Sequence, residues 1–406
     1  MLNGGRPRPV PRPPAAVLAA LLCGLMVILC STDATAYTWM VRHGYATCAP
    51  CHHDPAGGGI LTAYGRSVGS LVLNTRWEGD PDEHDKTADF LLGAVPLPAE
   101  VMLGGDLRLL WLAQKLQGTD VRHYTFLMQA DAEAAFRVKG VLGSASLGYA
   151  EDGAFDAAIT NGPEKNLVSR VHWLGYELDE STGLTVRAGR MNLPFGIRNV
   201  EHTLWARATT GTSINADQQH GIAFAWAPTP FRTELMAILG NYQTGPDQYR
   251  ERGYSGFFEW WPLTTLGVGV SSLVTHRDTD PIYLTETWRQ SHGLFARWAT
   301  PYSPLVVLAE ADYVQRSPKD NLTSKGTVGY LQADYEPLQG VHFLVTGEAQ
   351  HYGVHGTPWS FGAWVSEVWF MAPHLDLRID NIYQSVGDVG GRTSSLTLLA
   401  QAHLYL

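Results

Sequence analysis

Cysteine is scarce in this sequence, with four residues among 406. Cys23 and Cys30 lie in an apolar stretch near the N-terminus, whereas Cys48 and Cys51 stand three positions apart further along. If the N-terminal stretch is removed on export, only the second pair remains. Two cysteines this close together leave none for a structural disulfide in a chain of this size.

Positive charge is also in the minority, with 29 Lys and Arg against 39 Asp and Glu and a formal net charge of −10. Proteins that bind nucleic acid use a basic surface to neutralise phosphates. We therefore expect no nucleic-acid partner. The sequence also lacks a nucleophile triad, a phosphate-binding glycine loop and a second cluster of metal ligands. Those absences argue against the common hydrolytic and phosphoryl-transfer enzymes.

Long apolar runs are limited to one, from Ala15 to Cys30, which follows Arg6, Arg8 and Arg12. A basic lead, a short apolar core and small residues at a cleavage site are typical of an export signal. Ala34-Thr35-Ala36 supplies the small residues. The apolar core is short for a membrane span. We expect residues 1–36 to be a signal peptide that is removed after Ala36.

One motif stands out from this background, Cys48-Ala49-Pro50-Cys51-His52. Two cysteines separated by two residues and followed by histidine form the attachment pattern of c-type haem. Each thiol adds to a porphyrin vinyl group, and the adjacent imidazole becomes the proximal iron ligand. A zinc site would need a second pair of ligands, and a redox dithiol is the other alternative. We predict one haem c, held by Cys48 and Cys51 through thioethers and by His52 at the iron.

The sixth iron ligand and the propionate partner are open to several candidates. His43 is favoured as the distal ligand because it lies just upstream of the motif; His84, Met40 and Met102 are alternatives. Two histidine ligands give a low potential and favour electron transfer, whereas an empty position permits ligand binding or peroxidase activity. Arg66 is a candidate partner for a haem propionate, with a solvated arginine as the alternative.

The stretch from Cys48 to Arg66 resembles the start of small monohaem cytochromes c. After the motif it contains Gly57-Gly58-Gly59, which lets the backbone pass close to a flat ligand. Apolar residues from Leu61 to Val72 then recur at helical spacing. The resemblance implies a small, partly helical haem domain over residues 37–99. Since about 60 residues make a small core, we expect the haem to complete it.

From Glu100 to Leu406 the pattern changes to segments of about ten residues that alternate apolar with polar side chains. In the last segment, Leu396, Leu398 and Leu404 share one parity. Short turns rich in proline or glycine, such as Lys139-Gly140, alternate with longer polar loops, as in outer-membrane barrels. The expected loops include Glu151 to Asn166, His276 to Arg289 and Gln315 to Lys325. Aromatic residues gather near segment ends, where membrane interfaces would lie. They include Trp111, Trp173, Trp226, Trp261, Trp298 and Trp364. We predict a mainly β fold, a transmembrane antiparallel β-barrel of about 16 strands, in preference to a soluble sandwich.

The same parity assigns polar residues to the barrel lumen, and the assigned set is net acidic, which suits a hydrated pore that favours cations. The set is Gln129, Asp131, Glu133, Glu310, Asp312, Gln332, Asp334, Glu348, Asp376, Arg378 and Asp380. The longest loop, Asn192 to Gln218, either folds inward as a constriction or is exposed.

The chain end, Ala402 to Leu406, resembles the terminal assembly signal of bacterial outer-membrane proteins, and residues 100–406 look like a porin-type barrel. Together the two parts resemble the porin and cytochrome components of outer-membrane electron conduits. The resemblance implies electron transfer at or across the outer membrane, with the haem domain on the periplasmic side. Expected partners are periplasmic redox proteins or multihaem cytochromes, and outer-membrane lipid. The alternatives are a transport porin with a haem-bearing plug or redox gate and a peroxidase; an enzyme is not favoured.

Overall fold

The structure is a computed structural model that describes residues 38–77, 83–149, 167–199, 203–214, 216–242, 246 and 248–406. The predicted signal peptide lies outside these residues. Ala34–Leu406 form one compact unit. Within the described ranges, no helix is both long enough and apolar enough to cross a membrane.

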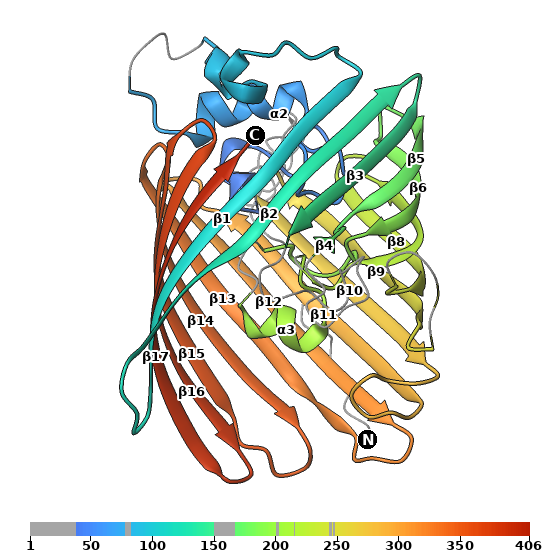
Figure 1. Cartoon of the computed structure of the whole chain (residues 1–406), viewed down its shortest axis with the longest axis vertical. Coiled ribbons are helices and arrows are strands. Elements are labelled where there is room, and N and C mark those ends of the chain that lie inside the picture. The colour runs from blue at the N-terminus through green and yellow to red at the C-terminus, as the bar shows by residue number, and fades with distance from the viewer. Residues whose placement is uncertain are drawn as a thin grey trace, which may run out of the picture. The chain divides into compact units, whose positions relative to one another are not determined.

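The unit is built on one antiparallel sheet that closes on itself (Figure 1). Its strands are β1 Val101–Leu116, β2 Arg122–Val138, β3 Val141–Tyr149, β4 Leu167–Val168, β5 His172–Asp179, β6 Leu184–Met191, β7 Gln219–Trp226, β8 Phe231–Gly240, β9 Glu251–Leu263, β10 Leu266–Arg277, β11 Thr287–Ala299, β12 Leu305–Pro318, β13 Ser324–Leu338, β14 Val341–Gly353, β15 Ser360–Ala372, β16 Leu375–Asp388 and β17 Gly391–Tyr405.

Closure comes from the pairing of the first strand with the last, with Asp106 of β1 opposite Tyr405 of β17. The two-residue strand β4 and strand β5 both pair with β3, so they form one interrupted strand of the wall. Counted in this way, the described residues make a wall of 16 strands. The predicted fold class and strand number are confirmed, and a single closed sheet excludes the sandwich.

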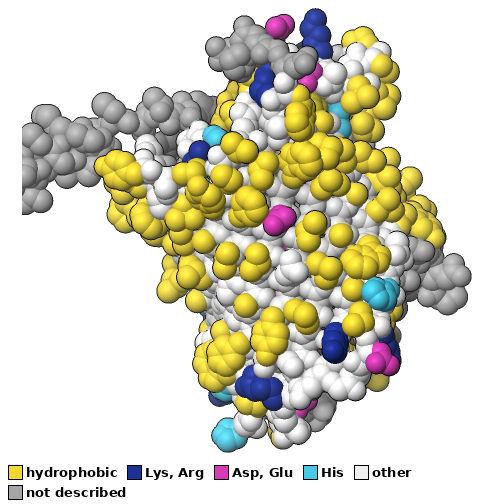
Figure 2. Space-filling model, turned by 90° about the vertical axis from the view of Figure 1, so that its left-hand side faces the viewer, with side chains coloured by type: hydrophobic (Ala, Val, Ile, Leu, Met, Phe, Trp, Pro, Cys, Tyr) yellow, Lys and Arg dark blue, Asp and Glu magenta, His cyan; other side chains and the backbone are white. Residues whose placement is uncertain are grey.

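The two faces of the wall divide as the alternation predicted. Asp376 and Asp380 are buried on the lumen side of β16, whereas Ile379 points outward and is 43% exposed. His403 of β17 is likewise buried, and its ring lies 2.7 Å from the carboxylates of both Asp106 and Asp376. Figure 2 shows one outer face, where hydrophobic side chains spread over the wall and charged ones lie mainly towards its two ends.

The connections also alternate between the two ends. One end, here called the short-turn end, carries tight turns such as Lys139-Gly140, where both residues have positive φ, as a type I′ hairpin turn requires. The other end carries the longer loops. Two of these are shorter than expected, at residues 278–286 and 319–323, because the flanking strands extend further. The predicted loop at 151–166 lies outside the described residues.

The aromatic prediction is only partly right. Trp111, Trp226 and Trp298 point outward and are exposed, but Trp173, Trp261 and Trp364 are buried inside the barrel. Inside the barrel, the Trp173 ring stacks on that of His53 with centroids 5.3 Å apart, and Trp364 Nε1 donates to Glu348 at 3.0 Å. Aromatic composition near a strand end therefore does not by itself identify a membrane-facing side chain.

The segment before the barrel has little regular structure and lies at the short-turn end (Figure 1). Its elements are η1 Thr38–His43, α2 Ala63–Val68, η2 Gly69–Leu73, η3 Lys86–Ala88 and η4 Phe90–Gly93. α2 begins after Thr62, whose hydroxyl accepts a hydrogen bond from the Gly65 N–H at 3.0 Å. α2 and η2 together match the helix expected between Leu61 and Val72.

Candidate functional site

The Cys48–His52 motif forms a single helical turn. The N–H groups of Cys51 and His52 both donate to the carbonyl oxygen of Cys48, at 3.2 and 2.9 Å. In such a turn, residues three and four positions apart lie on one face. The two thiols and the imidazole are therefore presented on the same side, and all three line one cavity. This is the arrangement that the attachment chemistry requires.

The cavity has a volume of about 240 Å³ and lies inside the barrel. Three parts of the chain line it. The N-terminal segment supplies the motif, the loop after β6 supplies Ile197 and Arg198, and the wall supplies residues such as Arg232. Its size is close to the lower end of small-molecule pockets. The motif thus faces a space that no single part of the chain creates alone.

A glycine turn follows the motif on the edge of this cavity. Gly57, Gly58 and Gly59 have φ values of +85°, +82° and +64°, a region that other residues rarely adopt. A Cβ added at Gly57 would lie 3.0 Å from the Cys48 sulfur, whereas one added at Gly58 would meet nothing within 4 Å. The turn therefore brings bare backbone to the cavity, as expected for close approach of a flat ligand.

Burial favours the neutral form of the imidazoles of His52 and His53. It lowers the pKa of His52, and the Nδ1 atom of that ring has no hydrogen-bond partner in the described part of the chain. A neutral ring is the form that binds a metal. Burial, assisted by the charge of Arg137, also lowers the pKa of His53 to about 4. The His53 ring stacks on Trp173 with centroids 5.3 Å apart, so its contacts are those of a packed core residue.

A buried ionic cluster attaches the motif to the wall. Asp54, two residues after His52, pairs with Arg187 of β6, which has no exposed surface. Arg187 also pairs with Glu234 of β8. Glu234 in turn binds Arg198 at 3.2 Å. Arg187 and Glu234 therefore join the turn that follows the Cys48–His52 motif to β6, β8 and the loop that lines the cavity.

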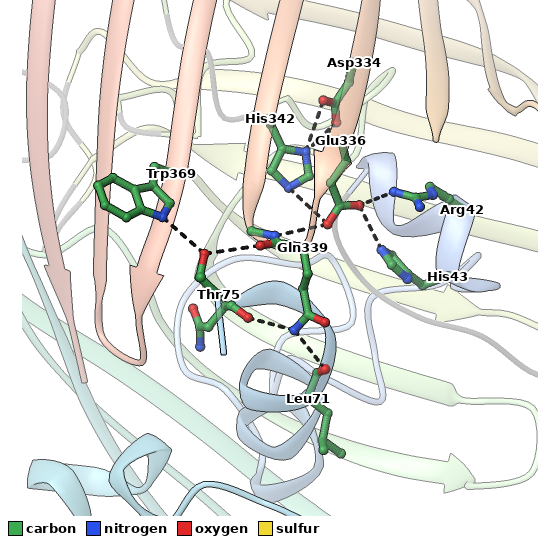
Figure 3. A network of polar contacts seen from close by, with 11 residues as sticks. Arg42, His43, Leu71, Thr75, Asp334, Glu336, Gln339, His342 and Trp369 are labelled. Carbon is green, nitrogen blue, oxygen red and sulfur yellow. Dashed lines mark hydrogen bonds and ion pairs between the residues drawn. The ribbon is translucent and has the colours of Figure 1, made fainter. Parts of the chain in front are cut away.

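A second attachment holds the N-terminal segment at the ends of β13, β14 and β15 (Figure 3). Glu336 binds Arg42, and its Oε2 atom lies 3.3 Å from Nε2 of His43. Gln339 donates to the carbonyl oxygens of Leu71 and Asn74, at 3.0 and 2.7 Å. His43, predicted as the distal ligand, thus lies against the wall and is not among the residues that line the cavity.

The other candidate residues are distributed differently. Arg66, the predicted propionate partner, lines the cavity, but its Nη2 donates to the carbonyl of Leu103 at 2.6 Å. Met40 also lines the cavity and is buried. His84 is not part of the lining; its ring lies 3.1 Å from the Ser70 hydroxyl. Met102 is on β1 and is likewise not part of the lining.

The loop between β6 and β7 folds into the lumen, which is one of the two alternatives expected from the sequence. It carries helix α3, Trp205–Thr210, and Arg207 forms a buried ion pair with Glu310 of β12. The Ile197 N–H donates to Glu310 at 2.8 Å, and the Trp205 N–H donates to Glu348 at 2.9 Å. Inward carboxylates assigned by parity therefore serve to hold this loop.

Sequence reasoning missed the basic residues of the site. Arg187, Arg232 and Arg297 share the lumen-facing parity of their strands, so parity could have identified them. Arg187 and Arg297 are buried, and Arg232 is partly buried. The net acidic lumen inferred from the sequence does not describe the cavity, whose lining contains more arginines than carboxylates.

Comparison with known proteins detects fold similarity only. No protein-family model and no curated protein matches the sequence. Among solved structures, the outer membrane channel DcaP of Acinetobacter baumannii matches with a TM-score of 0.56 and 12% identity, over 75% of this chain and 97% of that one. The anion-selective porin from Comamonas acidovorans gives 0.54 and 12%, over 75% and 99%. OmpT of Vibrio cholerae, lacking loop L8, gives 0.54 and 10%, over 75% and 99%. The chain thus has the 16-strand antiparallel β-barrel fold of outer-membrane porins.

Proposed function

We propose that this chain is an outer-membrane barrel that carries one haem c on Cys48 and Cys51, inside its periplasmic mouth, and takes part in electron transfer. The observation that carries the proposal is that both thiols and the His52 imidazole line one cavity within a porin-type barrel. A motif used only for packing would not need its three reactive groups on one accessible face.

The membrane location is supported by the outer face of the wall. Residues such as Leu294, Leu331 and Val345 point outward and are more than half exposed, which water would disfavour and lipid would not. A closed sheet also satisfies every strand without an edge, as the bilayer demands. In barrels of this kind the short turns face the periplasm. The N-terminal segment would then lie on the periplasmic side.

The residues present fit a covalently bound haem. Cys48 and Cys51 would hold it, and His52 would bind the iron. Arg232 Nη1 donates to the Cys48 sulfur at 3.4 Å, which links the motif to β8. The buried pair of Asp54 and Arg187 fixes the turn against the wall. The haem supplies one-electron chemistry, and the protein supplies a fixed position and partial exclusion of water.

One haem does not span a hydrocarbon layer about 30 Å thick. The chain therefore needs a second redox partner to move electrons across the membrane. A periplasmic redox protein would meet the short-turn end, and a multihaem cytochrome or a small soluble species would take the other role.

A transport porin with a redox gate is a second candidate, and one observation favours it. The N-terminal segment and the loop after β6 both occupy the lumen, and Arg187, Glu234 and Arg198 connect them. A change of redox state at the motif would therefore be transmitted to the loop through these ion pairs. Conductance of the purified protein that changes on reduction, in liposomes without another cytochrome, would favour the gate. Electron delivery to an enclosed acceptor would favour the relay.

The direct test uses protein extracted from outer membranes with detergent. We expect a c-type absorption spectrum in the oxidised and reduced forms, and a mass that exceeds the polypeptide chain by one haem. The double variant Cys48→Ala/Cys51→Ala should lose both signals. His351→Gln, on an exposed residue of β14, is the matched control and should keep them. Wild-type protein with two free thiols and no porphyrin mass would refute the proposal.

A further inference from the structure

The cavity beside the motif is rich in positive charge, although the whole chain has a net charge of −10. Three carboxylate residues lie in its lining, against six arginines. The arginines are Arg66, Arg108, Arg170, Arg198, Arg232 and Arg297. An excess of guanidinium groups in a confined space favours an anionic ligand.

Most of these arginines already have strong partners. Arg170 binds Asp131 at 2.8 Å. Arg232 and Arg297 share the carboxylate of Glu259, at 3.0 and 2.6 Å. Arg66 donates to a backbone carbonyl, as described above. These guanidinium groups contribute positive electrostatic potential to the cavity, but they have few hydrogen-bond donors left for a ligand.

Arg198 and Arg108 differ from the others. Arg198 uses Nη2 to bind Glu234, but its Nε and Nη1 atoms are buried and have no hydrogen-bond partner among the described residues. The Nε atom of Arg108 is likewise buried without a hydrogen-bond partner among the described residues. The carboxylate of Asp106 lies 3.9 Å from the Nη2 atom of Arg108. Buried donors without acceptors are costly, so such groups in native proteins usually meet a water or a ligand.

We infer that Arg198 and Arg108 bind carboxylate groups of a ligand in this cavity, and that these carboxylates are the haem propionates. The inference rests on the proposed function. A carboxylate is the group that guanidinium donors bind most strongly, because the hydrogen bonds are charge-assisted. Arg198 is held in place by Glu234 and Arg187, so it is preorganised for this role. A free organic acid has the same chemistry and is the other possible source of the carboxylate.

The first experiment measures the reduction potential of the haem protein as a function of pH. In Arg198→Gln and Arg108→Gln, the propionates lose a cationic partner, so their negative charge favours the ferric state. We expect a lower potential and an upward shift of the propionate pKa that is visible in the pH profile. Arg198→Lys should restore most of both effects. Haem content should stay unchanged, since Cys48 and Cys51 hold the haem covalently.

Arg252→Gln is the matched control, since Arg252 pairs with Asp278 at the loop end, where the two side chains are 40% and 68% exposed. Its potential should equal that of the wild type. If the potentials of the Arg198 and Arg108 variants also equal that of the wild type at every pH, the propionate assignment is overturned.

The second experiment tests the free-acid source with the haem-free variant Cys48→Ala/Cys51→Ala. Binding of succinate is measured by calorimetry, with and without Arg198→Gln. Binding that is lost with Arg198 supports a carboxylate site that takes a free acid. Absence of binding, together with unchanged potentials, rejects the carboxylate site altogether. Wild-type protein without haem would instead defeat the proposed function, while the succinate measurement would still decide the carboxylate site.

Discussion

The barrel wall and the N-terminal segment are held in place by different kinds of interaction. Each wall strand is hydrogen-bonded to a neighbour on both sides, so the sheet satisfies its own backbone. In its described part, the segment over residues 38–99 has no helical run longer than α2 followed by η2 and no strand that pairs with the wall. It is held instead by side chains, such as Arg187 on Asp54 and Glu336 on Arg42.

This difference also appears in the packing. Met40 and Cys51 of the segment belong to the same buried cluster as Phe257 and Phe295 of the wall. Among the described residues, the segment forms no buried hydrophobic cluster separate from that of the wall. The wall is therefore the scaffold. The geometry of the Cys48–His52 motif depends on contacts within the segment and on contacts with the wall.

The strongest test of this comparison is deletion of residues 38–99 with the export signal kept. Because the sheet satisfies its own hydrogen bonds, we expect the barrel to assemble in the outer membrane. Because the segment fills the short-turn end, we expect single-channel conductance in planar bilayers to rise several-fold. The control is Cys48→Ala/Cys51→Ala, which keeps the segment and should conduct like the wild type. Failure of the deleted protein to assemble would show that the wall depends on the segment.

Replacing Arg187 with Met is the next largest change, because it cuts the main attachment between the two regions. It leaves the carboxylate of Asp54 unpaired beside the motif and weakens the neutralisation of Glu234. Breaking a buried ion pair from one side costs about 3–5 kcal/mol. We expect a lower Tm in detergent and a broadened haem spectrum.

The control for Arg187 is an exposed pair at the far end of the barrel. Arg252→Gln breaks the contact with Asp278, where the two side chains are 40% and 68% exposed. Exposed pairs contribute about 0–1 kcal/mol. Equal losses of stability in the two variants would mean that the segment is not held through Arg187.

The wall could be predicted from the sequence because its signals are local. Alternation sets the face of each residue in a strand, so the inward positions of Asp376 and Asp380 followed from parity alone. Turn chemistry likewise marked Lys139-Gly140 as a hairpin. The motif Cys48–His52 was equally local, since its chemistry depends on spacing within five residues.

The interior of the barrel could not be predicted in the same way. Parity gives the face of a residue but not its partner, and Asp54 and Arg187 lie 133 residues apart. The sequence predicts Trp173 and Trp261 at the membrane interface, because position near a strand end does not show which aromatic side chains meet the chain inside the lumen. The prediction of His43 as distal ligand used nearness in the chain, whereas Glu336 binds His43 in the structure.

The smallest expected effects come from the glycine turn, where two neighbouring positions separate backbone strain from contact with the motif. Gly57 and Gly58 both have positive φ, so alanine at either costs about 1–2 kcal/mol in backbone strain. Only at Gly57 does the new Cβ press on the Cys48 sulfur, at 3.0 Å. We therefore expect both variants to lower Tm slightly, and Gly57→Ala alone to reduce the haem bound per chain, measured by absorbance against protein mass. If Gly58→Ala reduces haem content as strongly, the open space beside Gly58 must be filled in the haem-bearing protein. Glycine would then be required in this turn because the porphyrin contacts it, and not because a side chain would press on the thiol.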